Sequence, residues 1–323
     1  MMFSYDARGI KLNGSEFWLD AHRKVSFSFI SHGHADHIKN HDAILATPPT
    51  VQFHARRARQ KKAIPLAFGE SFSLDGMNIE LYPAGHVLGS AMIRIESDGL
   101  SLLYTGDFKI KKSWTASPIE IPPADVLIME STFGHPDFVY NQTPEYLANE
   151  LFEFVQDCFH AGIQPIILAY SLGKAQEAMK ILGDAGYNVC VHKSAWEIAK
   201  IYQHFGVEFN HCALWKEEPL EPRQVLILPP HSFKYKKVKN LPYRRRTVFL
   251  SGWANSENGI RFGGDHCIPL SDHADFQELL DFVKQVNPQK VYTTHGFEEF
   301  PFHLRDLGYD AELLKETGQT SLF

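Results

Sequence analysis

The sequence has few cysteines, no excess of positive charge and no long apolar run. Its 323 residues include four cysteines, none in a C-x-x-C pair, which argues against a disulfide framework and favours reduced thiols in a cytoplasmic protein. No apolar run reaches membrane-spanning length and no secretion signal is visible, so no membrane partner is expected. The net charge of -6 disfavours a protein that coats nucleic acid, so any such contact must be local.

The length and the order of predicted elements indicate two domains. A chain of 323 residues exceeds what a single core usually supports. Strands and helices alternate over residues 141–262, which predicts a small parallel α/β unit. Residues 1–140 and 263–323 would then form one discontinuous domain around this insertion.

The segment 31–37, Ser-His-Gly-His-Ala-Asp-His, is the densest group of polar ligand types in the chain. It follows an alternating strand-like stretch at residues 25–30. Imidazole and carboxylate are poor core material unless they are paired or bound to a metal, and both are good ligands for zinc. A polar surface loop is the alternative, because the chain has 17 histidines. The candidate ligands are His32, His34, Asp36 and His37.

Further candidates each follow a predicted strand later in the chain. Strand ends meet at one edge of a sheet, so ligands far apart in sequence can share a pocket. One histidine after a strand would be an ordinary turn residue, whereas the whole set predicts a metal centre. These candidates are His86, Asp107, Glu130, His273 and His295.

Two divalent ions would suit this set, with zinc favoured over manganese. Such a pair lowers the pKa of a water toward about 7 and polarises a phosphoryl oxygen. Asp107 is the downstream carboxylate placed to bridge both ions. His273 would protonate a leaving oxygen or hold a phosphate oxygen, and Glu130 would fix its tautomer. Asp20 is either a turn acid or an acceptor that orients a metal-bound histidine.

These motifs resemble those of metallo-β-lactamase-fold hydrolases. Glu130, His273 and His295 match three motifs that the β-CASP nucleases add to this fold. Segments 251–254 and 270–275 resemble, more narrowly, the bacterial ligase-associated DNA exonucleases, which are compact SNM1-like enzymes. The resemblance implies an α/β protein, namely an αββα metallo-β-lactamase sandwich with an inserted small parallel α/β (β-CASP) domain.

The resemblance also implies roles for single residues. Asp107 would be shared by the two metals, Asp36 would also orient the nucleophilic water, and His273 and Glu130 would serve catalysis. One metal would bind His32, His34 and His86. The other would bind Asp36, His37 and His295.

The implied activity is a two-metal exonuclease that cleaves single-stranded DNA in repair, with a ligase or helicase as partner. His295 is typical of RNA-processing relatives, so an RNA 3'-end processing or decay nuclease is the alternative. A small-molecule hydrolase and a non-catalytic nucleic-acid-binding module are further alternatives. The inserted domain argues against the first, and the complete ligand set argues against the second.

Several cations are candidate phosphate contacts. A basic run near residues 234–246 would give a local positive field, although such runs are often solvated faces. Lys109 follows Asp107 closely, while Ser171 and Lys174 lie at a predicted helix start that could bind a phosphate or simply be capped. The candidates in the basic run are Lys234, Lys236, Arg244 and Arg245.

Overall fold

The computed structural model describes residues 2–234, 238, 241–242, 244–254 and 265–316. The chain forms two compact units. The first unit comprises Met1–Ile110, Ala116–Val139 and His273–Phe323, and the second comprises Lys111–Thr115 and Tyr140–Asp272. The second unit thus extends ten residues beyond the expected boundary at 262, because strand β17 (His266–Ile268) pairs with β16 (Arg245–Leu250).

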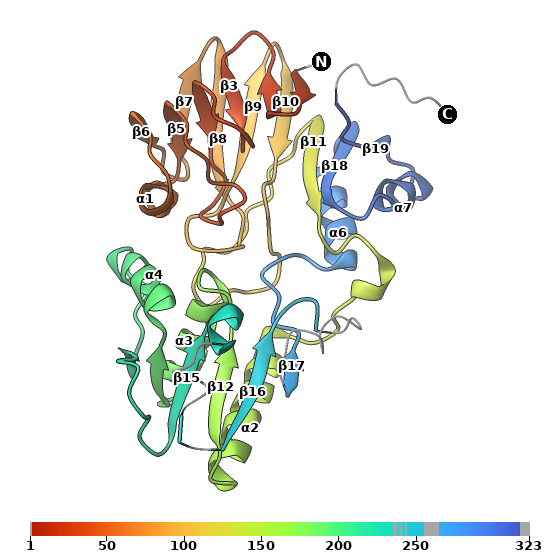
Figure 1. The fold of residues 1–323 in the computed structure, drawn as a ribbon. Coiled ribbons are helices and arrows are strands. Elements are labelled where there is room, and N and C mark those ends of the chain that lie inside the picture. Colours follow the sequence, from red (N-terminus) through yellow and green to blue (C-terminus); the bar gives the residue numbers. More distant parts are fainter. Residues whose placement is uncertain (1, 235–237, 239–240, 243, 255–264, 317–323) are drawn as a thin grey trace. The chain divides into compact units, whose positions relative to one another are not determined.

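Two mixed β-sheets form the centre of the first unit (Figure 1). One sheet has the order β1(Phe3–Asp6), β2(Gly9–Leu12), β3(Phe17–Leu19), β4(Phe27–Phe29), β5(Ala43–Ala46), β6(Lys62–Pro65). The other has the order β19(Ala311–Leu313), β18(Lys290–Gly296), β11(Val126–Ser131), β10(Leu100–Tyr104), β9(Ala91–Ser97), β8(Met77–Pro83), β7(Ser71–Leu74).

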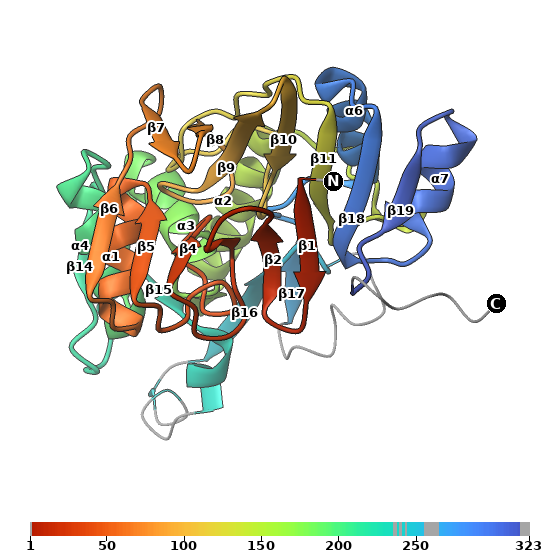
Figure 2. The same cartoon turned by 90° about the horizontal axis from the view of Figure 1, so that it is seen from above.

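Apolar side chains fill the space between these sheets and cover their outer faces. The central cluster combines Phe29 and Leu45 of one sheet with Ile79 and Ile93 of the other. Helix α1 (Pro48–Arg57) packs outside the first sheet through a small cluster around Ile44. Helices α6 (Phe276–Val286) and α7 (Phe300–Asp306) cover the second sheet, as Figure 2 shows. The layers are therefore helix, sheet, sheet and helix, the predicted αββα sandwich.

Local sequence explains the turn of one hairpin and both ends of one helix in the first unit. The β7–β8 hairpin turns at Asp75 and Gly76, whose φ angles of 49° and 81° suit the tight turn that matches strand twist. Helix α6 begins at a capping box between Asp275 and Glu278. It ends at Asn287, which is left-handed with φ 53° and so stops the helix.

The second unit is a parallel α/β unit, as the alternation of elements predicts. All strand pairs in its sheet are parallel. The strand order is β14(Cys212–Leu214), β13(Asn188–Val191), β15(Gln224–Leu228), β12(Gln164–Leu168), β16, β17. The α-helices of this unit are α2(Pro144–His160), α3(Lys174–Asp184) and α4(Lys193–His204). One short 3-10 helix, η2(Pro230–Lys234), lies in this unit, and another, η1(Pro136–Phe138), lies in the first unit. Within the described part of the chain, every helix is too short or too polar to cross a bilayer.

Candidate metal centre and active site

The strand directions of the first unit bring the predicted ligands to one edge of the sandwich. In the larger sheet, β8 and β10 are each antiparallel to β9, while β11 and β18 are parallel to β10. The carboxyl ends of β8, β10, β11 and β18 therefore share an edge. His86 and Asp107 follow β8 and β10, whereas Glu130 and His295 end β11 and β18. The histidine segment follows β4 of the facing sheet and is tied across by a hydrogen bond from Ala91 N to Ser31 O (2.9 Å).

Three imidazoles converge in what we term the inner set, which consists of His32, His34 and His86. The Nδ1 atom of His34 lies 3.0 Å from Nε2 of His32 and 3.0 Å from Nε2 of His86. One ligand atom from each ring and one from Asp107 lie within 4.8 Å of one another. Nitrogens bound tetrahedrally to zinc at 2.0–2.1 Å are about 3.3 Å apart. The spacing of these donors therefore fits a zinc-sized divalent ion.

The outer set consists of Asp36, His37 and His295. The Nε2 atom of His37 lies 3.7 Å from Oδ2 of Asp36. The His295 ring is 5.7 Å from the His37 ring, centroid to centroid. The Asp36 side chain is 78% exposed, so this set opens to solvent.

Asp107 faces both sets with different oxygens. Its Oδ2 lies 3.5 Å from Nε2 of His32 and 3.9 Å from Nε2 of His86. Its Oδ1 lies 3.7 Å from Nε2 of His37. A carboxylate in this position can hold one cation on each oxygen, which is the geometry that a bridging ligand needs.

A β-bulge delivers His295 to this edge. The pairing of β11 and β18 shifts register so that Glu130 is opposite Thr294 and Ser131 is opposite Gly296. His295 is the extra residue, with a left-handed φ of 49° that is unusual for a side chain other than glycine. A Cβ at Gly296 would lie 1.7 Å from the Ser131 carbonyl oxygen, so the bulge also requires glycine there.

The buried carboxylate of Asp20 binds the histidine segment through hydrogen bonds. It accepts hydrogen bonds from Ser31 N (2.8 Å), Ser31 Oγ (2.5 Å), Tyr104 Oη (2.9 Å) and His37 Nδ1 (2.8 Å). The last bond leaves Nε2 of His37 free for a metal. Ser31 and Tyr104 were not singled out from the sequence, because a tyrosine in an apolar strand is indistinguishable from core packing.

Glu130 and His273 form a buried pair beside the inner set. Nδ1 of His273 donates to the Glu130 carboxylate at 3.0 Å, so its Nε2 is on the side of the ring away from this carboxylate. The His273 ring lies 4.7 Å from the His86 ring. Glu130 also accepts from Phe108 N at 2.8 Å and from Thr132 Oγ1 at 2.5 Å. This carboxylate therefore orients both the His273 ring and the backbone next to Asp107; Thr132 was not predicted.

Burial and neighbouring charges shift the pKa values at this edge in opposite directions. Burial raises the pKa of Asp107 to about 7, and the Glu130 and Asp36 carboxylates add to this effect while His37 and His273 oppose it. Burial opposes protonation of His37, but Asp107 and Asp20 raise its pKa to about 10. Burial and the neighbouring histidines lower the pKa of His32 well below 6.5. The neutral form of His32 is thus favoured, whereas the Asp107 and Asp20 carboxylates favour the charged form of His37.

The chain is similar in sequence to several known proteins. A model of the Zn-dependent metallo-hydrolase RNA specificity domain matches residues 266–314. A probable DNA ligase of Opitutus terrae is 37% identical over 324 residues, covering 98% of this chain and 31% of the relative. Cleavage and polyadenylation specificity factor 73 of Drosophila melanogaster is 36% identical over 302 residues, covering 74% and 42%. RNase aCSPSF2 of Saccharolobus solfataricus is 25% identical over 289 residues, covering 75% and 57%.

The chain belongs to the β-CASP group of metallo-β-lactamase-fold proteins. Its first unit is the metallo-β-lactamase sandwich and its second is the β-CASP unit. It spans from about a third to somewhat more than half of the length of these relatives.

The predicted phosphate contacts of this β-CASP protein have different surroundings. Lys174 is buried, and its ammonium is ion-paired with Asp272 rather than open to a phosphate. Ser171 is half-buried after β12, with its Oγ 2.8 Å from Ser194 Oγ. Lys109 is 5% exposed, and no hydrogen-bond or ion-pair partner of its ammonium is found among the described residues.

The basic run of the β-CASP unit is only partly described. Arg244 is exposed. Arg245 is half-buried, donates to Val238 O at 3.1 Å and lies over the Phe233 ring. Lys236 lies outside the described residues, as does the side chain of Lys234. Arg244 and Arg246, which is also exposed, are thus cations of this run that the structure places at the surface.

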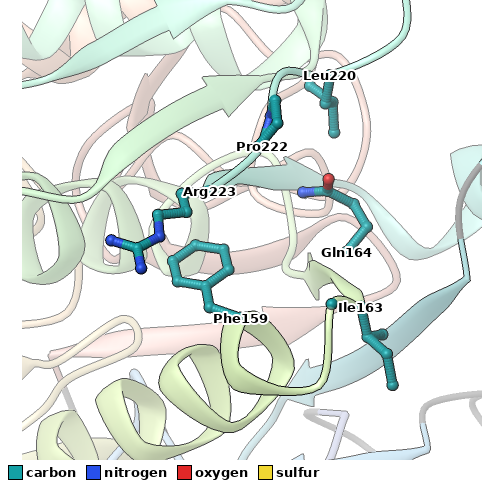
Figure 3. Close-up of a pocket in the computed structure, with 7 residues that line it drawn as sticks. Phe159, Ile163, Gln164, Leu220, Pro222 and Arg223 are labelled. Atoms are coloured by element: carbon teal, nitrogen blue, oxygen red, sulfur yellow. The ribbon is translucent and has the colours of Figure 1, made fainter.

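A pocket of about 300 Å³ lies elsewhere in the β-CASP unit (Figure 3). Phe159, Gln164 and Arg223 line it near the amino ends of β12 and β15. Ser171 follows the carboxyl end of β12. The pocket is therefore at the opposite end of this strand from the predicted phosphate contact.

Proposed function

We propose that the chain is a metal-dependent phosphodiesterase that acts on nucleic acid, specifically a DNA exonuclease in repair. The observation that carries this proposal is the position of Asp107, whose two oxygens face the inner and the outer set separately. Two divalent ions, with zinc favoured over manganese, would lower the pKa of a water and withdraw charge from the phosphoryl oxygens. His32, His34 and His86 would hold one ion, Asp36, His37 and His295 the other, and Asp107 both.

The remaining residues of the site supply positioning and proton transfer. Burial opposes ionisation of Glu130, but the charge and hydrogen bonds of His273 and Thr132 lower its pKa below its usual value. The ionised carboxylate keeps the proton of His273 on Nδ1 and leaves Nε2 facing away from Glu130. Nε2 can then hold a phosphate oxygen or exchange a proton with the leaving oxygen. Asp36 would orient the attacking water from the open side.

The similarity of nearly the whole chain to a protein named as one that acts on DNA favours DNA as the substrate. Nearly the whole chain matches about a third of a protein named a probable DNA ligase. A nuclease joined to a ligase would prepare the ends that the ligase seals, which also supports a ligase as a partner in repair. Lys109, a buried cation two residues after Asp107, is the proposed contact to a backbone phosphate, with Ser171 and Arg244 as further candidates.

An RNA 3'-end processing or decay nuclease is the second candidate. It is supported by His295, by the RNA specificity domain model and by relatives named as an RNase and as a polyadenylation factor. The choice between DNA and RNA does not change the proposed reaction at the phosphate. We also propose that the protein acts in the cytoplasm.

Digestion of end-labelled single-stranded DNA and RNA of the same sequence, with zinc or manganese, tests the proposal. We expect shortening of DNA at a rate well above that of RNA. Cleavage of RNA alone would replace the first candidate by the second. Hydrolysis of neither polymer by protein that carries its metals would contradict both.

A further inference from the structure

Two chain segments of the β-CASP unit continue directly into the proposed active site. The segment Lys111–Thr115 belongs to this unit by its contacts, although it begins only four residues after Asp107. Asp272 is the last residue of the same unit and precedes His273. Asp107 and His273 are therefore each joined by a short stretch of chain to a segment that belongs to the β-CASP unit.

Glu177 of helix α3 holds the first segment. Its buried Oε1 accepts hydrogen bonds from Ser113 Oγ (2.6 Å), Trp114 N (3.0 Å), Thr115 N (3.1 Å) and Thr115 Oγ1 (2.6 Å). Glu177 is only 5% exposed. Charge-assisted bonds of this kind are about twice as strong as neutral ones, so a single carboxylate fixes three consecutive residues.

Lys174, one turn earlier on the same helix, holds the second segment. Its ammonium is ion-paired with the Asp272 carboxylate, and both side chains are buried. Breaking a buried pair by removing one partner leaves an uncompensated charge. Residues separated by three positions lie on one face of a helix. Lys174 and Glu177, in the first turn of α3, therefore bind Asp272 and the segment Lys111–Thr115, respectively.

The same two segments run together inside the metallo-β-lactamase unit. Ala274 N donates to Phe108 O at 2.9 Å. Glu130 Oε1 accepts from Phe108 N at 2.8 Å and from His273 Nδ1 at 3.0 Å. The residues next to Asp107 and His273 are thus joined to each other at the site, and their continuations are joined through α3.

We propose that Lys174 and Glu177 are positioning residues for Asp107 and His273. This inference rests on the proposed function. Helix α3 fixes where the two segments end, and the short stretches of chain between α3 and the site transmit that placement to the metal-bridging carboxylate and to the His273 ring. Neither residue touches the substrate in this account.

Glu177→Gln tests the hold on the first segment with little change in shape, because the neutral amide keeps one acceptor oxygen but loses the charge that strengthens all four hydrogen bonds. We expect kcat to fall by about 10²-fold, the loss typical of a small misplacement of catalytic groups. The matched control is Glu145→Gln, because Glu145 binds the same segment at the surface, through Lys112 at 3.0 Å. The control should keep the wild-type kcat.

Lys174→Met tests the hold on the second segment, with Lys180→Met as the control. Lys180 lies on the same helix and pairs with Asp184 at the surface. Since Lys174→Met leaves Asp272 without its cation, the double variant Lys174→Met/Asp272→Asn is measured too, because it removes both charges. We expect both Lys174 variants to lose about 10-fold or more in kcat, and Lys180→Met to lose none.

The substrates and the metal-binding measurement separate positioning from other roles. Each variant is assayed on labelled DNA and RNA and on bis(4-nitrophenyl) phosphate, a small diester that cannot reach a polymer-binding surface. Zinc affinity is measured by competition with a chromogenic chelator. We expect a lower kcat on both kinds of substrate with little change in KM, and weaker zinc binding in Glu177→Gln, at unchanged secondary structure by circular dichroism.

Three results would overturn the inference. One is a loss confined to the polymer with a raised KM, which would make α3 a substrate contact. Another is a loss that tracks the unfolded fraction, which would make its role structural. The third is an unchanged kcat. Failure of the wild-type protein to cleave either polymer would instead contradict the proposed function, and the diester and zinc measurements would still test the positioning.

Discussion

The inner and outer ligand sets, which face different oxygens of Asp107, differ in how deeply they are buried and in how closely their ligand atoms are already brought together. The inner set is formed by His32, His34 and His86, with nitrogens 3.0 Å apart, and the side chains of His32 and His86 are fully buried. The outer set contains the exposed carboxylate of Asp36 and depends on a bulged residue, His295. Preformed, desolvated ligands cost little to order, so the inner site should bind metal more tightly than the outer one.

For the two proposed metals, this difference predicts that the inner one is retained and that the outer one exchanges with solvent more readily. The outer set faces solvent, where a substrate phosphate would also approach, and its ligands leave room for it. The inner set is enclosed and is backed by the Glu130–His273 pair. The bridging carboxylate couples the two, so changes at Asp107 should affect both sites.

Asp107→Ala should have the largest effect. It removes the oxygens that face both sets, so we expect loss of both metals and a fall in kcat of at least about 10³-fold. Elemental analysis and nuclease assays measure the two effects. Asp125→Ala is the matched control, because Asp125 binds Ser101 at the opposite end of the β10–β11 pair. A variant of Asp107 that kept both metals would break the comparison.

His273→Ala should leave both metals in place and still remove most of the cleavage. Loss of a proton-transfer or phosphate-holding group typically costs about 10²–10⁴-fold, so kcat should fall by that order. The pH–rate profile should lose one limb. Near-normal cleavage by this variant would show that the ring has neither role.

His34→Ala and His295→Ala compare the two sets directly. His34→Ala should release the inner metal and leave activity low at every metal concentration. His295→Ala should weaken only the outer site, so that added manganese restores part of the activity. If the two variants lose the same activity and recover it equally when manganese is added, the inner and outer sets do not differ in metal affinity.

Substitution of His41 should have the smallest effect, a change in how the free energy of unfolding depends on pH. His41 is a buried histidine that is not among the proposed metal ligands. Burial lowers the pKa of His41 to about 4, with a contribution from His54. Its folded-state value lies below the unfolded value of about 6.5, so its stabilising contribution falls as the pH decreases from 6.5 towards 4. Denaturant unfolding in the presence of a chelator should therefore show less acid destabilisation for His41→Asn than for the wild type. Identical pH profiles would exclude this role.

Much of the site could be predicted because strands, and the polar residues that end them, are visible in sequence. The residues that orient the ligands were less visible. Tyr104 lies in an apolar strand, and Lys174 is paired with Asp272, 98 positions away. The bulge at His295 depends on pairing between two distant strands. The extension of the second unit past residue 262 also depends on pairing between separate strands, because β17 pairs with β16 in a sheet whose other strands precede it.

We propose that Asp107 joins two metal sites that differ in their affinity for zinc. Crystals grown with zinc and measured at the zinc absorption edge test it directly. We predict two anomalous peaks, each about 2.0–2.2 Å from a different oxygen of Asp107, with the inner peak at higher occupancy when zinc is limiting. A single peak, or peaks that do not contact Asp107, would show that Asp107 does not bridge two metals.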